Sequence, residues 1–163
     1  MMQWLDGRIL ALIEARSDTT VTTVGDELRI GDMELYYGLQ SRDDSFVVTE
    51  YQRDAPGHRL TSNNPRVLNG FLLVNRALPS ALGLEFDLKA RALNRSVDGV
   101  EVRRSDDGHH ISWAEGTWAV TTSSTDAKML PYLGATEVDR IAQEVGFDID
   151  EAVRSVGGPS AAS

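Results

Sequence analysis

The sequence predicts a single-domain α+β protein, and three observations carry that prediction. The chain has 163 residues, which suits one domain that buries a core without disulfide or metal support. No internal repeat, low-complexity linker or shift in composition divides it. Its apolar residues follow helical spacing in some stretches and strict alternation in others. We therefore expect one domain over residues 1–156 and a disordered tail at 157–163.

The first part of the chain predicts a helix followed by an antiparallel β-meander. Residues 3–15 place apolar side chains at helical spacing, which is typical of an amphipathic helix. Short β-branched or alternating runs follow, and Gly-Asp or Arg-Asp-Asp turns separate them. Such short turns connect strands that are adjacent and antiparallel. The expected strands are 19–24, 27–30, a run that starts at Met33, 45–52 and a brief edge strand at 58–62.

A central helix is expected to begin at Asn63-Asn64-Pro65. Asn at a helix cap accepts a backbone N–H, and Pro at an early helical position sacrifices no intrahelical hydrogen bond. The apolar residues that follow, Phe71 among them, form a broad face that we expect to pack on the sheet. Pro79 bends or ends this helix.

Residues 84–97 leave two interpretations open. Leu84, Phe86 and Leu88 alternate with charged residues as they would in a strand, but the composition also suits a helix. We hold the segment as extended.

A second meander and short C-terminal helices complete the prediction. Alternation around Val100 and the Asp106-Asp107-Gly108 turn indicate a hairpin that returns over 109–114. If Glu115-Gly116 is a two-residue turn, Trp113 lies opposite Trp118 and Ile111 opposite Val120, all on one buried face. Ser123 or Ser124 and Thr136 are expected to cap two further helices, and 149–156 supplies the last one.

Composition limits the compartment and the partners. With 25 acidic and 16 basic residues, the formal net charge is −9, and the basic residues are scattered. Because nucleic acid is bound by clustered Lys and Arg, we do not expect it as a partner. No apolar run approaches the roughly 20 residues of a membrane span, so we expect no membrane partner. The chain start lacks signal-peptide features and cysteine is absent, which favours a cytoplasmic location.

No residue pattern indicates catalysis, and we expect neither an enzyme nor a cofactor. Asp106, Asp107, His109 and His110 lie close in sequence, but strand alternation sends the two histidines to opposite faces, so we expect no metal site. His58 follows Asp54 at the spacing of a base and its orienting acid, but no Ser or Cys nucleophile accompanies them in a recognisable motif.

Acidic side chains at hairpin turns are the candidate binding residues. Such turns can build a binding surface on a rigid scaffold, and an acidic surface suits a basic protein partner because complementary fields speed association. The alternative is that these are ordinary turn residues, since Asp is common in turns. The candidates are Asp43, Asp44, Asp106, Asp107 and Glu115.

Two groups of motifs carry a resemblance to a known family. The first half contains Leu35-Tyr36-Tyr37-Gly38 and Ser45-Phe46-Val47-Val48-Thr49 with Arg53, and the second half contains Leu130-Pro131-Tyr132-Leu133. With the capped central helix between them, the chain resembles the bacterial immunity proteins of polymorphic toxin systems. More closely, it resembles the actinobacterial family that includes the immunity factor of the tuberculosis necrotizing toxin.

This resemblance implies a non-catalytic antitoxin. Such a protein binds a secreted toxin domain made by the same cell, one to one, and blocks its active site. For the toxins nearest that immunity factor, the inhibited activity would be NAD(P) hydrolysis. The five acidic candidates would then be toxin-binding residues, and the free protein would be a monomer. The alternative from another class is a small acidic secretion chaperone that binds an effector segment as a dimer.

Overall fold

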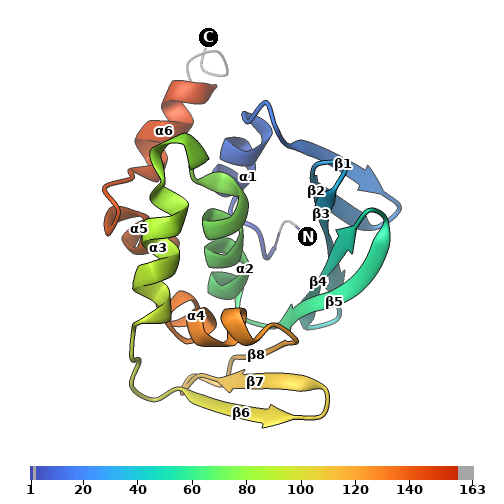
Figure 1. Ribbon diagram of the computed structural model, residues 1–163, viewed down its shortest axis with the longest axis vertical. Coiled ribbons are helices and arrows are strands. Elements are labelled where there is room, and N and C mark those ends of the chain that lie inside the picture. The colour runs from blue at the N-terminus through green and yellow to red at the C-terminus, as the bar shows by residue number, and fades with distance from the viewer. Residues whose placement is uncertain (2, 158–163) are drawn as a thin grey trace.

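The protein is built on one curved antiparallel sheet of eight strands. The structure, a computed structural model, describes residue 1 and residues 3–157. Neighbouring strands follow the order β1-β2-β3-β4-β5-β8-β7-β6, and the sheet curves around the helices (Figure 1). The strands are β1 (Thr20–Val24), β2 (Glu27–Gly31), β3 (Leu35–Arg42), β4 (Ser45–Gln52), β5 (Ala55–Ser62), β6 (Glu101–Ser105), β7 (Gly108–Ser112) and β8 (Trp118–Thr121).

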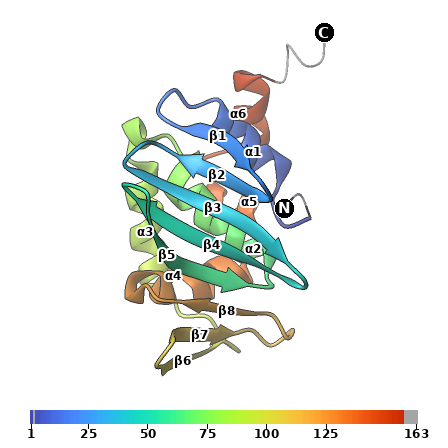
Figure 2. The ribbon, with the colours of Figure 1, turned by 90° about the vertical axis from the view of Figure 1, so that its right-hand side faces the viewer.

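The helices lie against the inner face of the sheet and leave the outer face of β1 to β5 uncovered (Figure 2). A π-helical turn, η1 (Leu73–Ala77), extends the central helix, and a 3-10 turn, η2 (Ser80–Leu82), follows it. The α-helices are α1 (Gly7–Glu14), α2 (Pro65–Leu72), α3 (Leu84–Leu93), α4 (Ser124–Ala135), α5 (Val138–Gln143) and α6 (Ile149–Val156). The predicted single-domain α+β fold with N-terminal, central and C-terminal helices is confirmed.

Alternation along the strands produces the core. Because successive side chains of a strand point to opposite faces, every second residue of β2 to β5 faces the helices. The central helix packs on these residues as predicted: the rings of Tyr37 and Phe71 meet edge to face, with centroids 5.1 Å apart. The fully buried strand residues of this layer are Ile30, Leu39, Phe46, Val48 and Leu60.

The two predicted meanders form one sheet. Leu60 of β5 pairs with Thr121 of β8, so β5 is a central strand and the prediction of an edge strand at 58–62 is wrong. The strand also begins earlier than the predicted residue 58, because Ala55, Pro56 and Gly57 already pair with β4. The pairing of β5 with β8 connects residues far apart in the sequence, so no local sequence pattern predicts it.

Two predicted helix caps are confirmed and one is wrong. Asn64 accepts a hydrogen bond from the backbone N–H of Arg66 at the start of α2, with Pro65 as the first helical residue. Ser123 accepts one from the N–H of Asp126 at the start of α4. Thr136 does not cap α5, since the N-cap position there is Glu137.

Residues 84–93 form α3, so the extended interpretation of this segment is wrong. Leu88 and Ala92 lie one helical turn apart, and both are completely buried. The charged residues at every second position allowed a strand, but a helix buries these two side chains together. Its first residue follows Gly83, which has the left-handed φ of +69°.

The predicted register of the second hairpin is wrong by one residue. Ile111 pairs with Ala119 and Ser112 with Trp118, so Trp118 and Val120 lie on the opposite face from Ile111. The connection is longer than a two-residue turn, since the N–H of Trp113 bonds to the carbonyl of Thr117. The core role of Trp113 is confirmed: the ring is buried, and its Nε1 donates to the carbonyl of Pro131.

In the described part of the chain, no helix is long and apolar enough to cross a membrane. The predicted disordered tail at 157–163 lies, apart from Gly157, outside the described residues.

Candidate binding surface

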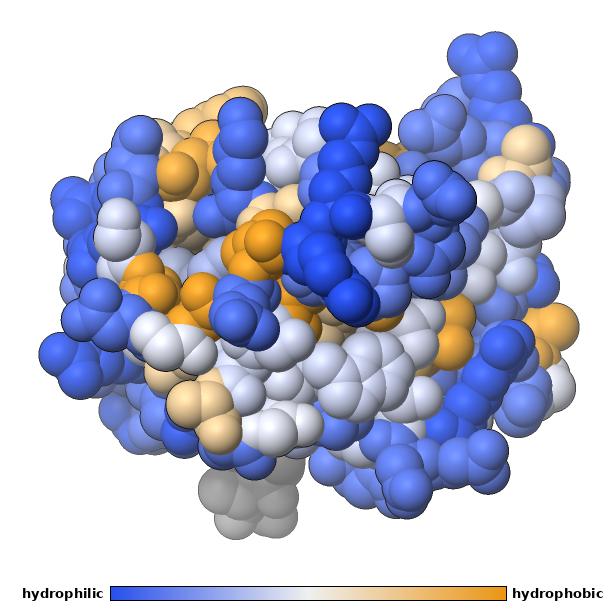
Figure 3. All heavy atoms as spheres, turned by 90° about the horizontal axis from the view of Figure 1, so that it is seen from below, coloured by the Kyte–Doolittle hydropathy of each residue, from blue (hydrophilic) through white to orange (hydrophobic). Residues whose placement is uncertain are grey.

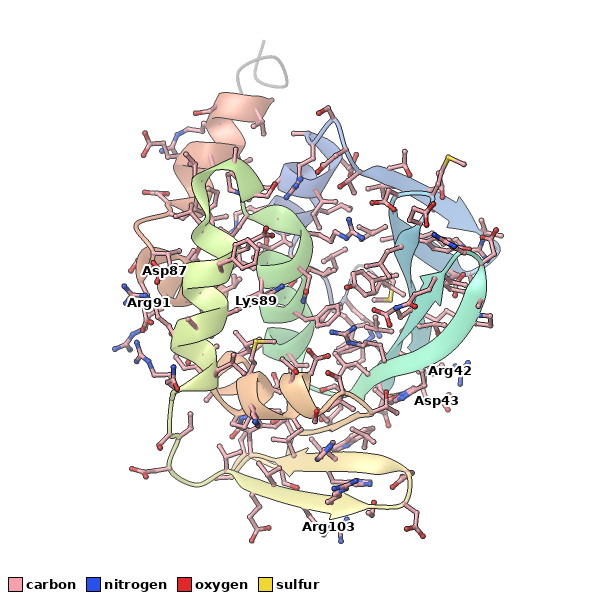
Figure 4. All side chains as sticks on the ribbon, viewed as in Figure 1. Arg42, Asp43, Asp87, Lys89, Arg91 and Arg103 are labelled. Carbon is pink, nitrogen blue, oxygen red and sulfur yellow. The ribbon has the colours of Figure 1, made fainter. Side chains whose placement is uncertain are left out.

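The five acidic candidates do not form one surface. Following the strand register, the turn with Asp43 and Asp44 and the connection with Glu115 lie at one end of the strands. The turn with Asp106 and Asp107 lies at the opposite end. Figure 4 places Asp43 beside the β3–β4 turn, apart from Arg103 on β6. Their role in binding stays a prediction, but no single flat contact covers all five.

Two of the candidates have partners within the protein: Glu115 accepts a hydrogen bond from the hydroxyl of Thr117 at 3.2 Å, and Asp107 is held more firmly. Asp107 accepts hydrogen bonds from the hydroxyl of Ser105 and, at 2.8 Å, from Nε2 of His110. The bond from His110, followed by the bond from Ser105, lowers the pKa of Asp107 to about 2. This carboxylate therefore stabilises its own hairpin turn.

The described residues contain no cluster of three or more His, Cys, Asp or Glu side chains that could hold a metal ion. His109 pairs with Thr121 and His110 with Val120, so the two imidazoles lie on opposite faces of β7, as alternation predicted.

A cluster of aromatic and charged side chains lies on the outer face of the sheet, and we call it the tyrosine cluster: Glu27, Arg29, Tyr36 and Tyr51. The two tyrosine rings are paired across β3 and β4 and stack with centroids 4.6 Å apart. The guanidinium of Arg29 lies 5.1 Å from the centroid of the Tyr51 ring and 5.5 Å from that of Tyr36. These distances are within the range of cation–π attraction.

Glu27 holds the cluster together from beneath. Glu27 is 7% exposed. Nε of Arg29 donates to this carboxylate at 2.6 Å, and the hydroxyl of Tyr51 donates at 3.0 Å. A buried carboxylate is costly unless it is paired, and here a cation and a hydroxyl compensate it.

Gly38 makes this arrangement possible. It lies in β3 between Arg29 of β2 and Thr49 of β4. A Cβ atom at Gly38 would lie 2.3 Å from Oε2 of Glu27, far inside van der Waals contact. Because Gly38 has no side chain, the carboxylate of Glu27 can lie over β3 and reach Tyr51 on β4.

A hollow and a strained turn border the tyrosine cluster. The hydroxyl of Tyr36 donates to Asp54 at 2.9 Å, in the turn between β4 and β5. Arg53 and Asp54 both have positive φ, 49° and 66°, a conformation that is costly for residues other than glycine. The side chain of Met33 is nearby and 92% exposed. The hollow has a volume of about 370 Å³ and is lined by Thr20, Thr22, Arg29, Met33, Tyr36 and Asp54, among others.

The protein should lose stability in alkali because of its tyrosines. The pKa values of all four, Tyr36, Tyr37, Tyr51 and Tyr132, are raised, first by burial, and that of Tyr132 reaches about 12. A raised folded pKa means that the contribution of the neutral phenol is complete below pH 10 and is lost as the pH rises through the folded value. We expect phenolate absorbance to appear at a higher pH in the folded protein than in the protein unfolded by urea. The circular dichroism of the folded protein should be lost as the phenolates form. Titration of the tyrosines at the same pH in the folded protein and in urea would contradict this expectation.

The sequence contains a pattern that indicates the tyrosine cluster, but the predicted binding site was based on acidic turn residues instead. Tyr36 and Gly38 have the opposite parity to the core residues Tyr37 and Leu39, so they had to face outward. A glycine in the middle of a strand often marks a close approach.

The comparisons with known proteins show the fold alone. Neither a protein-family model nor a curated protein sequence matches the chain. A solved structure, Rv3902c from M. tuberculosis, is similar, with a TM-score of 0.62 over 86% of this chain and 88% of that one. The two sequences are 14% identical.

Proposed function

We propose that this protein is an immunity protein, an antitoxin that binds a cognate secreted toxin domain and blocks its active site. The observation that carries this proposal is the tyrosine cluster. Tyr and Arg are enriched among the residues that dominate protein–protein binding energy. Here two stacked Tyr rings and an Arg are already held in place by Glu27, so binding would cost little side-chain ordering.

Charge supports a protein partner with a basic surface. The net charge of −9 would attract such a partner and orient it during encounter. The resemblance to the family of the necrotizing-toxin immunity factor suggests an NAD(P)-hydrolysing toxin, and it is compatible with a fold shared with a mycobacterial protein. We propose a one-to-one complex and a free monomer in the cytoplasm.

Co-expression with the toxin encoded by the neighbouring gene should protect cells that otherwise die. Replacing both Arg29 and Tyr51 with alanine should abolish protection, since truncation of residues that dominate an interface costs about 2 kcal/mol or more each. Arg103→Ala serves as the control, because Arg103 is exposed on the edge strand β6 (Figure 4), and β5, β8 and β7 separate that strand from β4 and the tyrosine cluster. If the unmodified protein forms no complex with that toxin on gel filtration, the proposal is wrong.

An exposed apolar stripe on α3 favours the second candidate, a dimeric secretion chaperone. Phe86 and Leu93 lie two helical turns apart on α3 and are 69% and 38% exposed, and Leu82, at the end of η2, is 70% exposed. Asp87 and Arg91 form an ion pair on the same helix and point away from the sheet (Figure 4). Light scattering separates the candidates: a monomer supports the antitoxin, and a stable dimer that Phe86→Glu dissociates supports the chaperone.

A further inference from the structure

The two edges of the sheet differ in their chemistry. At one edge, β6 is exposed along its whole length and carries Glu101, Arg103 and Arg104, charges that discourage another strand from pairing. The face seen from below, on the side of β6 and β7, has hydrophilic residues around its rim and apolar and intermediate residues toward its middle (Figure 3). At the other edge, β1 reads Thr-Val-Thr-Thr-Val and contains no charge, glycine or proline. Every residue of β1 is β-branched, the type that strands favour.

The backbone of β1 is available along its outer edge. An antiparallel edge strand leaves the N–H and C=O groups of alternate residues without a partner. Val24 and Glu27 flank a two-residue turn and form the pair that closes it, so the N–H of Thr23 points to the open edge. Among the described residues, no backbone hydrogen bond outside the β1–β2 ladder reaches β1. Figure 2 shows β1 at the upper edge of the outer face.

The charges around β1 determine what can occupy this edge. Asp18 precedes the strand, and its carboxylate is paired with Arg16 at 2.8 Å but keeps 61% of the side chain exposed. Asp26 lies in the turn after the strand. An antiparallel pairing of two copies centred on Thr22 would set Asp18 of each copy opposite Asp26 of the other, and like charges at such positions repel. A second copy is therefore disfavoured, whereas a strand with a basic residue at each end is complementary.

The hollow beside the tyrosine cluster extends this edge. Thr20 and Thr22 of β1 line it together with Asp32, Asp54 and Met33. A side chain from an added strand, pointing to the outer face, would enter this hollow. Arg29 also lines the hollow, but its charge is paired with Glu27, so the two carboxylates suit a Lys or Arg. The exposed Met33 suits the aliphatic part of such a side chain.

We propose that β1 pairs with an extended, basic segment of a partner protein, which adds a ninth strand to the sheet beside β1. This proposal names the contact by which the proposed function would recognise its toxin, and it rests on that function for the identity of the partner. Backbone hydrogen bonds would supply affinity, and the hollow with its carboxylates would supply selectivity.

The test uses a short peptide of alternating Val and Thr with Lys at both ends, and a counterpart with Glu at both ends. Fluorescence polarisation should show binding of the Lys peptide and about tenfold weaker binding of the Glu peptide. Thr23→Pro removes one outward N–H and should weaken the Lys peptide about tenfold, because it leaves an acceptor on the peptide unpaired. Thr23→Ala keeps the N–H and should bind as the unmodified protein does.

The matched control is Arg104→Pro on the other edge. Arg104 lies one residue before the pair that closes the β6–β7 turn, as Thr23 does in β1, so its N–H also points outward. Equal weakening by both proline variants, or no binding of the Lys peptide, would overturn the proposal. A toxin complex without hydrogen-exchange protection of residues 20–24 would also overturn it. Failure to bind the neighbouring toxin, with peptide binding intact, would overturn the proposed function alone.

Discussion

Replacing Asp126 with alanine is expected to lower the free energy of unfolding by about 3 to 5 kcal/mol, the cost of leaving one member of a buried ion pair without its partner. Asp126 is 1% exposed, in the first turn of α4. Nε and Nη2 of Arg59 donate to its two oxygens at 2.6 and 3.0 Å. Urea unfolding followed by circular dichroism measures the loss.

The loss should be large because Arg59 connects three parts of the fold. From β5 it reaches Asp126 of α4 and, through Nη1 at 2.7 Å, Glu50 of β4, and it lies 5.5 Å from the centroid of the Phe71 ring. Burial, the largest single influence, acts to lower the pKa of Arg59, but the hydrogen bonding and charge of Asp126, together with the charges of Tyr37 and Glu50, outweigh it, so the pKa is raised. Without Asp126, the guanidinium keeps its burial and loses its principal partner.

Two further variants separate this cause from a general effect of mutation. Asp126→Asn keeps the volume and one acceptor oxygen, so it should destabilise less than Asp126→Ala. The double variant Arg59→Met with Asp126→Leu removes both charges of the buried pair, and it should recover part of the stability, because the only carboxylate among the described residues that it leaves without its Arg59 partner is that of Glu50, whose side chain is 22% exposed. A loss of less than about 1 kcal/mol for Asp126→Ala would show that the pair is screened as an exposed pair is.

Local signals explain which parts of the fold the sequence predicts well. The cap at Asn64, the strand at 45–52 and the last helix depend on residues within a few positions of each other, and all three were predicted where the structure has them. The place of β5 in the sheet depends on the contact of Leu60 with Thr121, which no local pattern encodes. The helix at 84–93 was mistaken because an alternating pattern and a helical one coincide over so few residues.

The tyrosine cluster falls between these cases. Counting back from the Asp43–Asp44 turn sets Tyr36 opposite Tyr51, so the sequence determines that pair once the hairpin is known. The contact of Glu27 with Tyr51 is different, because it crosses an intervening strand and requires Gly38 beneath it. Only the three-dimensional arrangement shows that the glycine and the carboxylate share one space.

Gly38→Ala should weaken binding of the cognate toxin by about tenfold to a hundredfold, about 1.4 to 2.8 kcal/mol. The φ angle of Gly38 is not positive, so alanine fits the backbone. The new methyl group would displace the carboxylate of Glu27, which lies within 2.5 Å of that position, and Tyr51 would lose its acceptor. The pKa of Tyr51, which burial and this hydrogen bond raise, should then fall toward 10. Phenolate absorbance reports that change without any partner.

The matched control is Gly57→Ala on β5, where the nearest atom to a new Cβ is a carbonyl oxygen 4.0 Å away. It should change neither toxin binding nor the titration of Tyr51. In a Glu27→Ala background, Gly38→Ala should cause no further loss, since the group that it displaces is already absent. If Gly38→Ala returns the pKa of Tyr51 toward 10 but leaves toxin affinity unchanged, the cluster is organised as described and the toxin binds elsewhere. If it changes neither, Glu27 does not hold the tyrosines in place.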